Sequence, residues 1–473
     1  MYDVDLQGRN EPRAMAVPVV ALEQRCCSRA RCDLFCLATV VGTLLATGCA
    51  APSRLKAVPL QLQDEAAVPG FPRHIRSWGD RVSPEFVAEC VAAAKREQDL
   101  LEKSESKLEV PAASFLALSG GGANGAFAAG LLCGWTAAGT RPPFSAVTGV
   151  STGAMIAPFA FLGSEYDGIL RDTYTTIETK DILSRRPILE AMFSDALADS
   201  KPLARLVGRC VNEELLTSIA DEYRKGRSLL ILTVDLDAQR PVIWNMTAIA
   251  ASRHPGSLQL FRSIMIASAS IPAAFPPVMI DVEVEGNRYQ EMHVDGGVTA
   301  QVFFHPPSFV LESELGAAGL HQRNRRLYVI RNAHLEPTAS SVERRTLKIA
   351  ARAIRTLVQT QGLGDVHRLY DLAQRDGIDF NLAYIPKDFD GPPSNEFDPV
   401  YMNRLFDRAF GSAQDGYPWS KLPPDLPKPP SCPTSGSLQE IPASPEVTRW
   451  RPCSTASAGR VTGVVSRERG SAW

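Results

Sequence analysis

The sequence predicts an α/β fold of three layers, in which a central, mostly parallel sheet is flanked by helices. Two glycine-rich loops support this prediction, because each follows a short apolar run and precedes an apolar helical stretch. Residues 115–118 lead into the loop at 120–125, and residues 144–147 lead into the loop at 149–153. A strand, a loop and a helix repeated in this order indicate parallel strands joined by helical crossovers.

The other predicted elements extend this pattern along the chain. A helix is expected at residues 83–107, where Ser83 is a suitable cap, Pro84 suits the first turn and apolar residues recur at helical spacing. Further helices are expected at 126–138, 151–160, 264–269 and 342–372, and further strands at 229–234, 241–245, 289–294, 326–331 and 380–385. No internal repeat and no second apolar core is evident, so one catalytic domain is predicted.

Composition excludes several classes of function. The 473 residues are 45% hydrophobic and 22% charged, with a net charge of -2, so no global positive field favours a nucleic-acid partner. The ten cysteines form no paired zinc-binding pattern. We therefore expect neither a metal nor another cofactor.

The N-terminus is typical of an exported protein. Arg25, Arg29 and Arg31 precede an apolar stretch at residues 34–46, which is too short to span a bilayer comfortably and suits a signal peptide. The stretch ends in small residues before Cys49, as in a bacterial lipobox, although Ala46 stands where leucine is usual. We predict a lipoprotein-like signal at residues 1–49, with lipidation of Cys49 and anchoring to a membrane surface at the outer membrane or the periplasmic side. A plain cleaved signal, an uncleaved anchor and a start at Met15 remain open alternatives.

Composition also divides the remainder of the chain. Residues 50–80 are rich in Pro, Ala and Gln and are predicted to be a tether, and residues 81–420 are predicted to form the catalytic domain. Residues 421–473 are rich in Pro and Ser and are predicted to be disordered.

A serine framed by glycines is the first candidate catalytic group. Gly149-Val150-Ser151-Thr152-Gly153 lies between an apolar strand and an apolar helix, the context of a sharp turn that exposes a nucleophilic hydroxyl. The free N–H groups at the start of the helix would favour developing negative charge. The alternative is a glycine turn in which Ser151 only caps the helix.

The second candidate is the loop Gly120-Gly121-Gly122-Ala123-Asn124-Gly125. Consecutive glycines leave backbone N–H groups accessible to an oxyanion. A phosphate loop is disfavoured because the Gly-Lys-Ser/Thr ending is missing. A dinucleotide fingerprint fits Gly120, Gly122 and Gly125, but no acidic residue ends a second strand about 20 residues later.

Asp295 is the candidate base. It follows the predicted strand at residues 289–294 and precedes Gly296 and Gly297, so a tight turn could present its carboxylate to the serine. An ordinary Asp-Gly hairpin is the alternative. A Ser-His-Asp triad would instead need one of the downstream histidines, and His293 is the nearest to Asp295.

Taken together, these three motifs resemble those of the patatin-like phospholipase family over residues 113–385, with weaker similarity to Trp419. The resemblance implies that Ser151 is the nucleophile, that Asp295 is the base, and that the turns are shaped by supporting glycines, namely Gly149, Gly153, Gly296 and Gly297. It implies an oxyanion hole built from the N–H groups of Gly120, Gly121 and Gly122, with Ala123 as a further candidate. Residues 267–277 resemble the family segment ahead of the aspartate and are expected to pack beside the acyl site. Asn124 departs from the family, which usually has Arg or Lys there.

The activity implied by the resemblance is hydrolysis of carboxylic esters of lipids, as by a phospholipase A or lysophospholipase, through a Ser-Asp dyad and an acyl-enzyme. Two alternatives remain open: a catalytically silent, lipid-anchored lipid-binding or scaffold protein, and a Ser-His-Asp lipase of the α/β-hydrolase class. The acyl chain, the head group, the positional specificity, the target membrane and the oligomeric state do not follow from the sequence.

Overall fold

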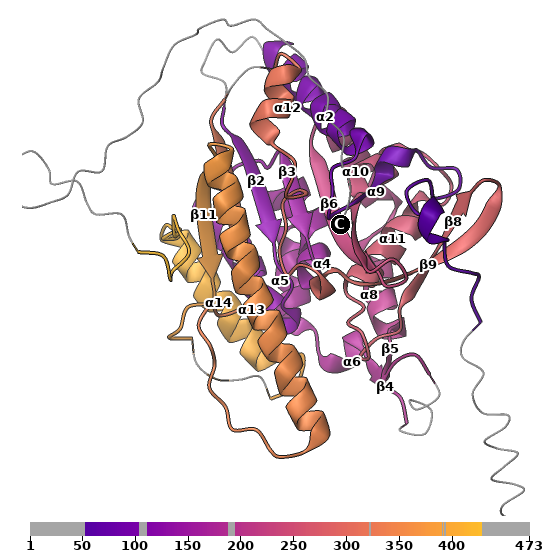
Figure 1. Cartoon of the computed structure of the whole chain (residues 1–473). Helices are drawn as coiled ribbons and strands as arrows, with labels where there is room; N and C mark the ends of the chain where they lie inside the picture. The colour runs from indigo at the N-terminus through magenta and orange to yellow at the C-terminus, as the bar shows by residue number, and fades with distance from the viewer. Residues whose placement is uncertain are drawn as a thin grey trace, which may run out of the picture. The chain divides into compact units, whose positions relative to one another are not determined.

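The computed structural model describes residues 53–103, 111–187, 194–320, 323–389, 391 and 394–427 (Figure 1). The predictions for residues 1–49, including lipidation of Cys49, lie outside these ranges, as does the predicted tail from residue 428 onward.

A mixed sheet forms the centre of the described chain. Across the described residues it has nine strands, in the order β1-β7-β6-β3-β2-β10-β11, with β9 paired to β6 and β8 paired to β9. The strands are β1 (Arg76–Trp78), β2 (Ala113–Leu118), β3 (Ala146–Gly149), β6 (Ser228–Asp235), β7 (Arg240–Asn245), β8 (Val278–Val284), β9 (Asn287–Asp295), β10 (Arg325–Arg331) and β11 (Asp379–Tyr384). The run from β6 to β11 is parallel, whereas β1, β7, β8 and β9 join antiparallel.

Helices cover both faces of the sheet, as the sequence predicted. Alternate residues of β2 point to opposite sides: Leu116 and Leu118 pack in one apolar cluster, and Phe115 and Ala117 in another. The first cluster contains residues of α3 (Gly125–Ala137), α4 (Thr152–Leu162), α5 (Asp167–Thr176), α8 (Lys201–Cys210), α9 (Glu213–Arg224), α10 (Met246–Ala251), α11 (Ser257–Ser268) and α14 (Pro399–Gln414). The second contains residues of α2 (Pro84–Lys103), α12 (Leu311–Ala317) and α13 (Thr346–Arg375). This confirms the predicted three-layer arrangement.

Small elements complete the described chain. They are the short helices α6 (Thr179–Ile182), η1 (Leu60–Leu62), η2 (Arg73–Ile75), η3 (Gly122–Asn124), η4 (Ser164–Tyr166) and η5 (Gly296–Val298), and a two-stranded sheet of β4 (Ser184–Arg185) and β5 (Ala198–Asp199). None of the helices in the described ranges is long and apolar enough to cross a bilayer.

The segment predicted to be a tether differs from expectation where the structure describes it, from residue 53 to residue 80. Ile75 and Trp78 are buried, and β1 adds an antiparallel strand to β7. Arg76 also donates to both carboxylate oxygens of Glu291 at 2.8 Å. The segment lacks helical or strand periodicity because it is mainly coil and short turns, but its few buried apolar side chains fix it to the domain.

Candidate active site

The chain turns sharply at Ser151, between β3 and α4. The residue has φ 54° and ψ -121°, a conformation that non-glycine residues rarely adopt, so the turn is strained. Two glycines make room for it: a Cβ at Gly149 would lie 2.5 Å from the Gly153 carbonyl oxygen, and a Cβ at Gly153 would lie 2.4 Å from the Leu118 carbonyl oxygen. The predicted supporting glycines thus permit the close approach of β3, α4 and β2.

A buried serine that the sequence did not single out holds this turn. The Ser151 N–H donates to Ser268 Oγ at 3.0 Å, and Ser268 Oγ donates to the Leu232 carbonyl oxygen at 2.7 Å. Ser268 is the last residue of α11 and is fully buried. Since the Ser151 amide is already bonded, it is not free to bind a substrate oxyanion in this conformation.

Asp295 reaches the serine because of the strand order. It ends β9 opposite Thr233 of β6, and β6 lies beside β3, the strand that ends at the turn before Ser151. The Ser151 hydroxyl lies near the Asp295 carboxylate and lowers its pKa, against the larger effect of burial. Its Oδ1 also accepts from the Gly297 N–H at 2.7 Å. The structure therefore brings together the two side chains that the sequence predicted to meet.

Burial changes the acidity of this carboxyl. Asp295 is almost entirely enclosed, and desolvation raises its pKa from 3.8 to about 6, although the bonds from Ser151 and Gly297 act in the opposite direction. A carboxylate with a pKa near 6 is a stronger base than an exposed aspartate, while it remains mostly ionised at neutral pH.

No histidine of the described chain hydrogen-bonds to Ser151 or Asp295. His293 is fully buried on β9, where its ring nitrogens contact Thr233 Oγ1 at 2.9 Å and Glu291 Oε2 at 3.1 Å. Its partners are structural groups of the antiparallel part of the sheet.

The glycine loop presents fewer free amides than the sequence suggested. The Gly120 N–H donates to the Gln301 carbonyl oxygen at 3.0 Å, so the expectation that it is available to an oxyanion is wrong for this conformation. The N–H groups of Gly121 and Gly122 have no acceptor among the described residues. A Cβ at Gly121 would lie 2.4 Å from the Asn332 carbonyl oxygen, whereas Gly122 has φ +57° and faces open space.

Buried polar groups brace this loop from behind. Ser119 Oγ accepts from the Asn332 N–H at 2.8 Å, and Asn332 Nδ2 donates to the Ser119 carbonyl oxygen at 2.9 Å. On the other side of the loop, Asp365 Oδ2 accepts from the Gln301 N–H at 2.6 Å. Asp365 thereby fixes the segment at Gln301, whose carbonyl oxygen accepts from the Gly120 amide.

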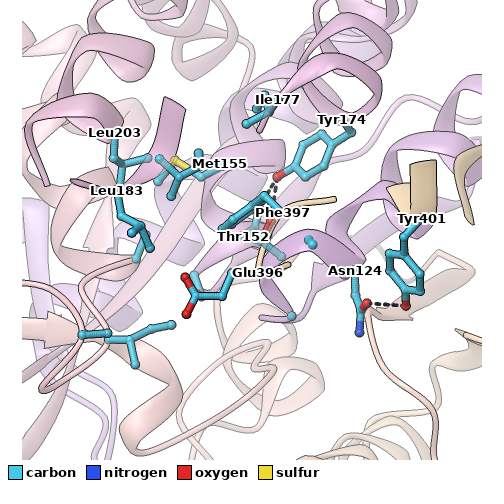
Figure 2. Close-up of a pocket in the computed structure, with 18 of the residues that line it drawn as sticks. Asn124, Thr152, Met155, Tyr174, Ile177, Leu183, Leu203, Glu396, Phe397 and Tyr401 are labelled. Atoms are coloured by element: carbon cyan, nitrogen blue, oxygen red, sulfur yellow. Dashed lines mark hydrogen bonds between the residues drawn. The ribbon is translucent and has the colours of Figure 1, made fainter. Parts of the chain in front are cut away.

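A buried cation also lies next to the loop. The Arg331 guanidinium is 3.5 Å from the Gly120 carbonyl oxygen, and desolvation lowers the pKa of Arg331 to about 10. It remains protonated at neutral pH and places a positive charge near the loop, where Asn124 supplies none. The Asn124 side chain instead accepts a hydrogen bond from Tyr401 of α14 at 2.8 Å (Figure 2).

A large cavity opens beside the serine. Its volume is about 1480 Å³, and its lining is predominantly apolar. Figure 2 shows Met155, Ile177, Leu183 and Leu203 around it, together with the hydrogen-bonded pair Thr152 and Tyr174. Ser151, Gly121 and Gly122 lie in its wall, as do Ala269, Ile271, Ala274 and Phe275 of the segment expected to pack beside the acyl site.

Comparison with known proteins gives one family match. Residues 116–307, which include the glycine loop, the serine turn and Asp295, match the family model described as Patatin-like phospholipase. No curated protein sequence matches the chain.

Two solved structures show distant similarity. VipD from Legionella pneumophila is 9% identical with a TM-score of 0.31, and the match covers 67% of this chain and 72% of that chain. Human GIVD cytosolic phospholipase A2 is 11% identical with a TM-score of 0.26, over 72% of this chain and 66% of that chain.

Proposed function

Residues 116–307 carry a patatin-like phospholipase domain, and from this premise we propose that the chain is a serine acyl hydrolase that cleaves carboxylic esters of lipids through a Ser151-Asp295 dyad. The observation that carries the proposal is a serine in the wall of a large apolar cavity, next to a buried carboxylate whose pKa is raised by burial and lowered by the serine hydroxyl.

In the acylation step, Asp295 takes the proton of the Ser151 hydroxyl as Oγ attacks the ester carbonyl carbon. The strained backbone at Ser151 places the residue in the cavity wall, and the bond from its own amide to Ser268 holds the turn in place. When the tetrahedral intermediate collapses, the leaving alkoxide takes the proton back from Asp295. The acyl group remains on Oγ.

The negative charge of the intermediate needs hydrogen-bond donors. The free amides of Gly121 and Gly122 line the cavity beside Ser151 and are the proposed donors. The short helix η3 begins at Gly122 and leads into α3 at Gly125, and the buried Arg331 charge adds a favourable potential. The Gly120 amide stabilises the loop by donating to the Gln301 carbonyl oxygen and does not bind substrate.

Deacylation reverses these roles. Asp295 takes a proton from a water molecule, whose oxygen attacks the acyl carbonyl, and the Ser151 oxygen leaves with the proton that Asp295 returns. The products are a carboxylic acid and the alcohol part of the substrate.

The cavity supports a lipid as the substrate. A volume of about 1480 Å³ exceeds that of the usual site for a small ligand, and apolar side chains dominate its lining. An acyl chain would lose its contact with water along this lining, which favours its binding. Short esters would bind the same dyad but leave most of the cavity unused.

Product analysis of the full chain on a mixed lipid extract tests the proposal. We expect free fatty acids from the wild type and a loss of about 10³-fold or more in rate for Ser151→Ala. Ser412→Ala is the matched control, because Ser412 lies on α14, bonds only within its helix and does not line the cavity. Equal hydrolysis by wild type and Ser151→Ala would reject the dyad; no hydrolysis by either would favour a silent lipid-binding protein.

We also propose export and lipid anchoring at Cys49, which rest on the sequence pattern of residues 25–49. Cys49→Ala should abolish the incorporation of labelled fatty acid into the protein and change the processing of its N-terminus. Fatty-acid labelling of that variant, with processing like that of the parent, would contradict the anchor.

A further inference from the structure

The first half of α13 has no packing partner within the described chain. All residues from 341 to 351 are exposed, and most remain so up to residue 358. Leu347, Ile354 and Leu357 are 83%, 60% and 69% exposed, values far above those of ordinary apolar side chains in a folded domain. In contrast, the second half of the same helix is anchored in the core through Val366 and Leu369.

These apolar residues occupy one face. Leu347, Ala350, Ala351, Ile354, Leu357 and Val358 recur at intervals of three and four, so they form a continuous stripe along the helix. We call this stripe the α13 apolar face. A face of this length in contact with water is costly and indicates an interaction surface.

Positive charge accompanies the stripe. Arg344, Arg345, Lys348, Arg352 and Arg355 lie on or just before the same turns, and the sequence contains no Asp or Glu from residue 344 to residue 364. Lys348, Arg352 and Arg355 fall on one side of the stripe at helical spacing. An apolar face bordered by cations complements an anionic lipid surface, where head groups meet the charges and acyl chains meet the face.

The helix begins next to the cavity. The segment that leads into it, from His334 to Ser340, forms part of the cavity wall, and Arg352 donates to the carbonyl oxygen of Thr338 in that segment. In Figure 1 the first half of α13 extends beyond the neighbouring helices, on the side where α6, β4 and β5 lie. Leu183 of the α6–β4 connection and Arg185 of β4 also line the cavity.

We propose that the α13 apolar face and its flanking cations form a docking surface for an anionic lipid bilayer, which would bring the cavity to the interface where lipid esters reside. The link to substrate rests on the proposed hydrolase function, whereas docking itself does not require turnover. The stripe would enter the boundary between head groups and acyl chains, and the cations would lie at the phosphates.

Vesicle flotation tests this directly. The protein is the full chain carrying Cys49→Ala, so that no attached lipid contributes, and the vesicles are phosphatidylcholine with or without phosphatidylglycerol. We expect binding to the anionic vesicles, and at least a tenfold weaker partition for the triple variant Leu347→Gln, Ile354→Gln, Leu357→Gln. Removing three cations by Arg344→Gln, Lys348→Gln and Arg355→Gln should weaken binding about fivefold per charge at low salt.

A matched control keeps the same chemistry elsewhere on the chain. Leu60→Gln removes an apolar side chain that is 77% exposed, and Lys95→Gln removes an exposed cation of α2. Neither residue lines the cavity. These variants should float like the parent. Equal flotation of the α13 variants and the parent would overturn the proposal, and so would a parent that does not bind anionic vesicles.

A second measurement identifies the occupant of the face. The indole introduced by Leu357→Trp should be quenched by brominated phosphatidylglycerol in the vesicles. An indole that is shielded without vesicles would instead assign the face to another segment of the chain. If light scattering shows a dimer for the parent and a monomer for the apolar triple variant, the α13 apolar face would be assigned to contact with a second copy of the chain. Because flotation requires no ester cleavage, its outcome is separable from failure of the hydrolase proposal.

Discussion

Replacement of the buried base should make the protein more stable while it abolishes activity. The Asp295 carboxylate is enclosed by protein, and its partners are the Ser151 hydroxyl and the Gly297 amide, neither of which carries a charge. Asp295→Asn keeps the size of the side chain, retains an oxygen for Gly297 and removes the ionised group.

The magnitude follows from the acidity of the group. The pKa of Asp295 rises from 3.8 to about 6 on folding because burial disfavours the charged form. This difference corresponds to about 3 kcal/mol. The folded state binds the proton more tightly, so this stabilisation is fully present below about pH 3.8 and is lost as the pH rises through about 6. Above that pH, Asp295→Asn should be the more stable protein by up to about 3 kcal/mol.

Urea unfolding of both proteins between pH 4 and pH 8 (roughly the range around these two pKa values) measures the effect. The control is Asp371→Asn, which removes an exposed carboxylate from α13 and should leave the free energy of unfolding nearly unchanged. A constant difference between wild type and Asp295→Asn across this range, or a less stable variant at pH 8, would refute the reasoning.

Three further predictions concern the turn, the base and the packing of helices. Ser268→Ala leaves the buried amide of Ser151 unpaired, so kcat on a short ester should fall at least tenfold while KM changes little. The control is Ser270→Ala, which removes a hydroxyl that donates to the Ile266 carbonyl oxygen of α11. Equal kcat values for Ser268→Ala and the wild type would contradict a positioning role. For the wild type, kcat/KM should rise tenfold per pH unit up to about pH 6 and then level, as the base loses its proton; a flat profile through pH 6 would exclude this carboxyl as the base. Gly130→Ala would place a Cβ 2.2 Å from the Phe406 carbonyl oxygen and should cost about 1–3 kcal/mol of stability in thermal unfolding, whereas Gly168→Ala, in open space on α5, should be neutral or stabilising.

Local patterns were sufficient to predict the parallel core. The buried strand β2 is apolar except for Ser114, and the glycine loop after it leads into α3, so the succession of strand, loop and helix is visible in the sequence. The long helix α13 was predicted from residue 342 and begins at Thr346. The strand β9 was predicted at residues 289–294, and in the structure it begins two residues earlier, at Asn287, and ends one residue later, at Asp295.

Elements that depend on distant partners were not predictable in the same way. The sequence analysis did not identify α14, although Gly130 and Gly134 of α3 pack closely against its Phe406 and Phe410 backbone. These contacts join segments far apart in the chain, and nothing near either segment indicates them. The strand β1 was missed for the same reason, because its pairing with β7 is decided by tertiary contacts.

In the candidate site, too, residues in local sequence patterns could be predicted, whereas residues that act through distant contacts could not. Ser151 and Asp295 stand in glycine-framed turns that a reader of the sequence can recognise, and the structure brings them into contact. Ser268 and Gln301 act through hydrogen bonds to backbone groups of distant segments, which leave no pattern in the sequence. The role assigned to the Gly120 amide was wrong because its acceptor, Gln301, lies far along the chain.

The rate at which a fluorophosphonate ester labels the full chain tests the central claim most directly, with the labelled residue located by peptide mass spectrometry. If Asp295 activates the Ser151 hydroxyl, the wild type carries the label on Ser151, and Asp295→Asn reacts about 10³-fold more slowly or beyond detection. Labelling at another residue, or equal labelling rates in the two proteins, would contradict the account.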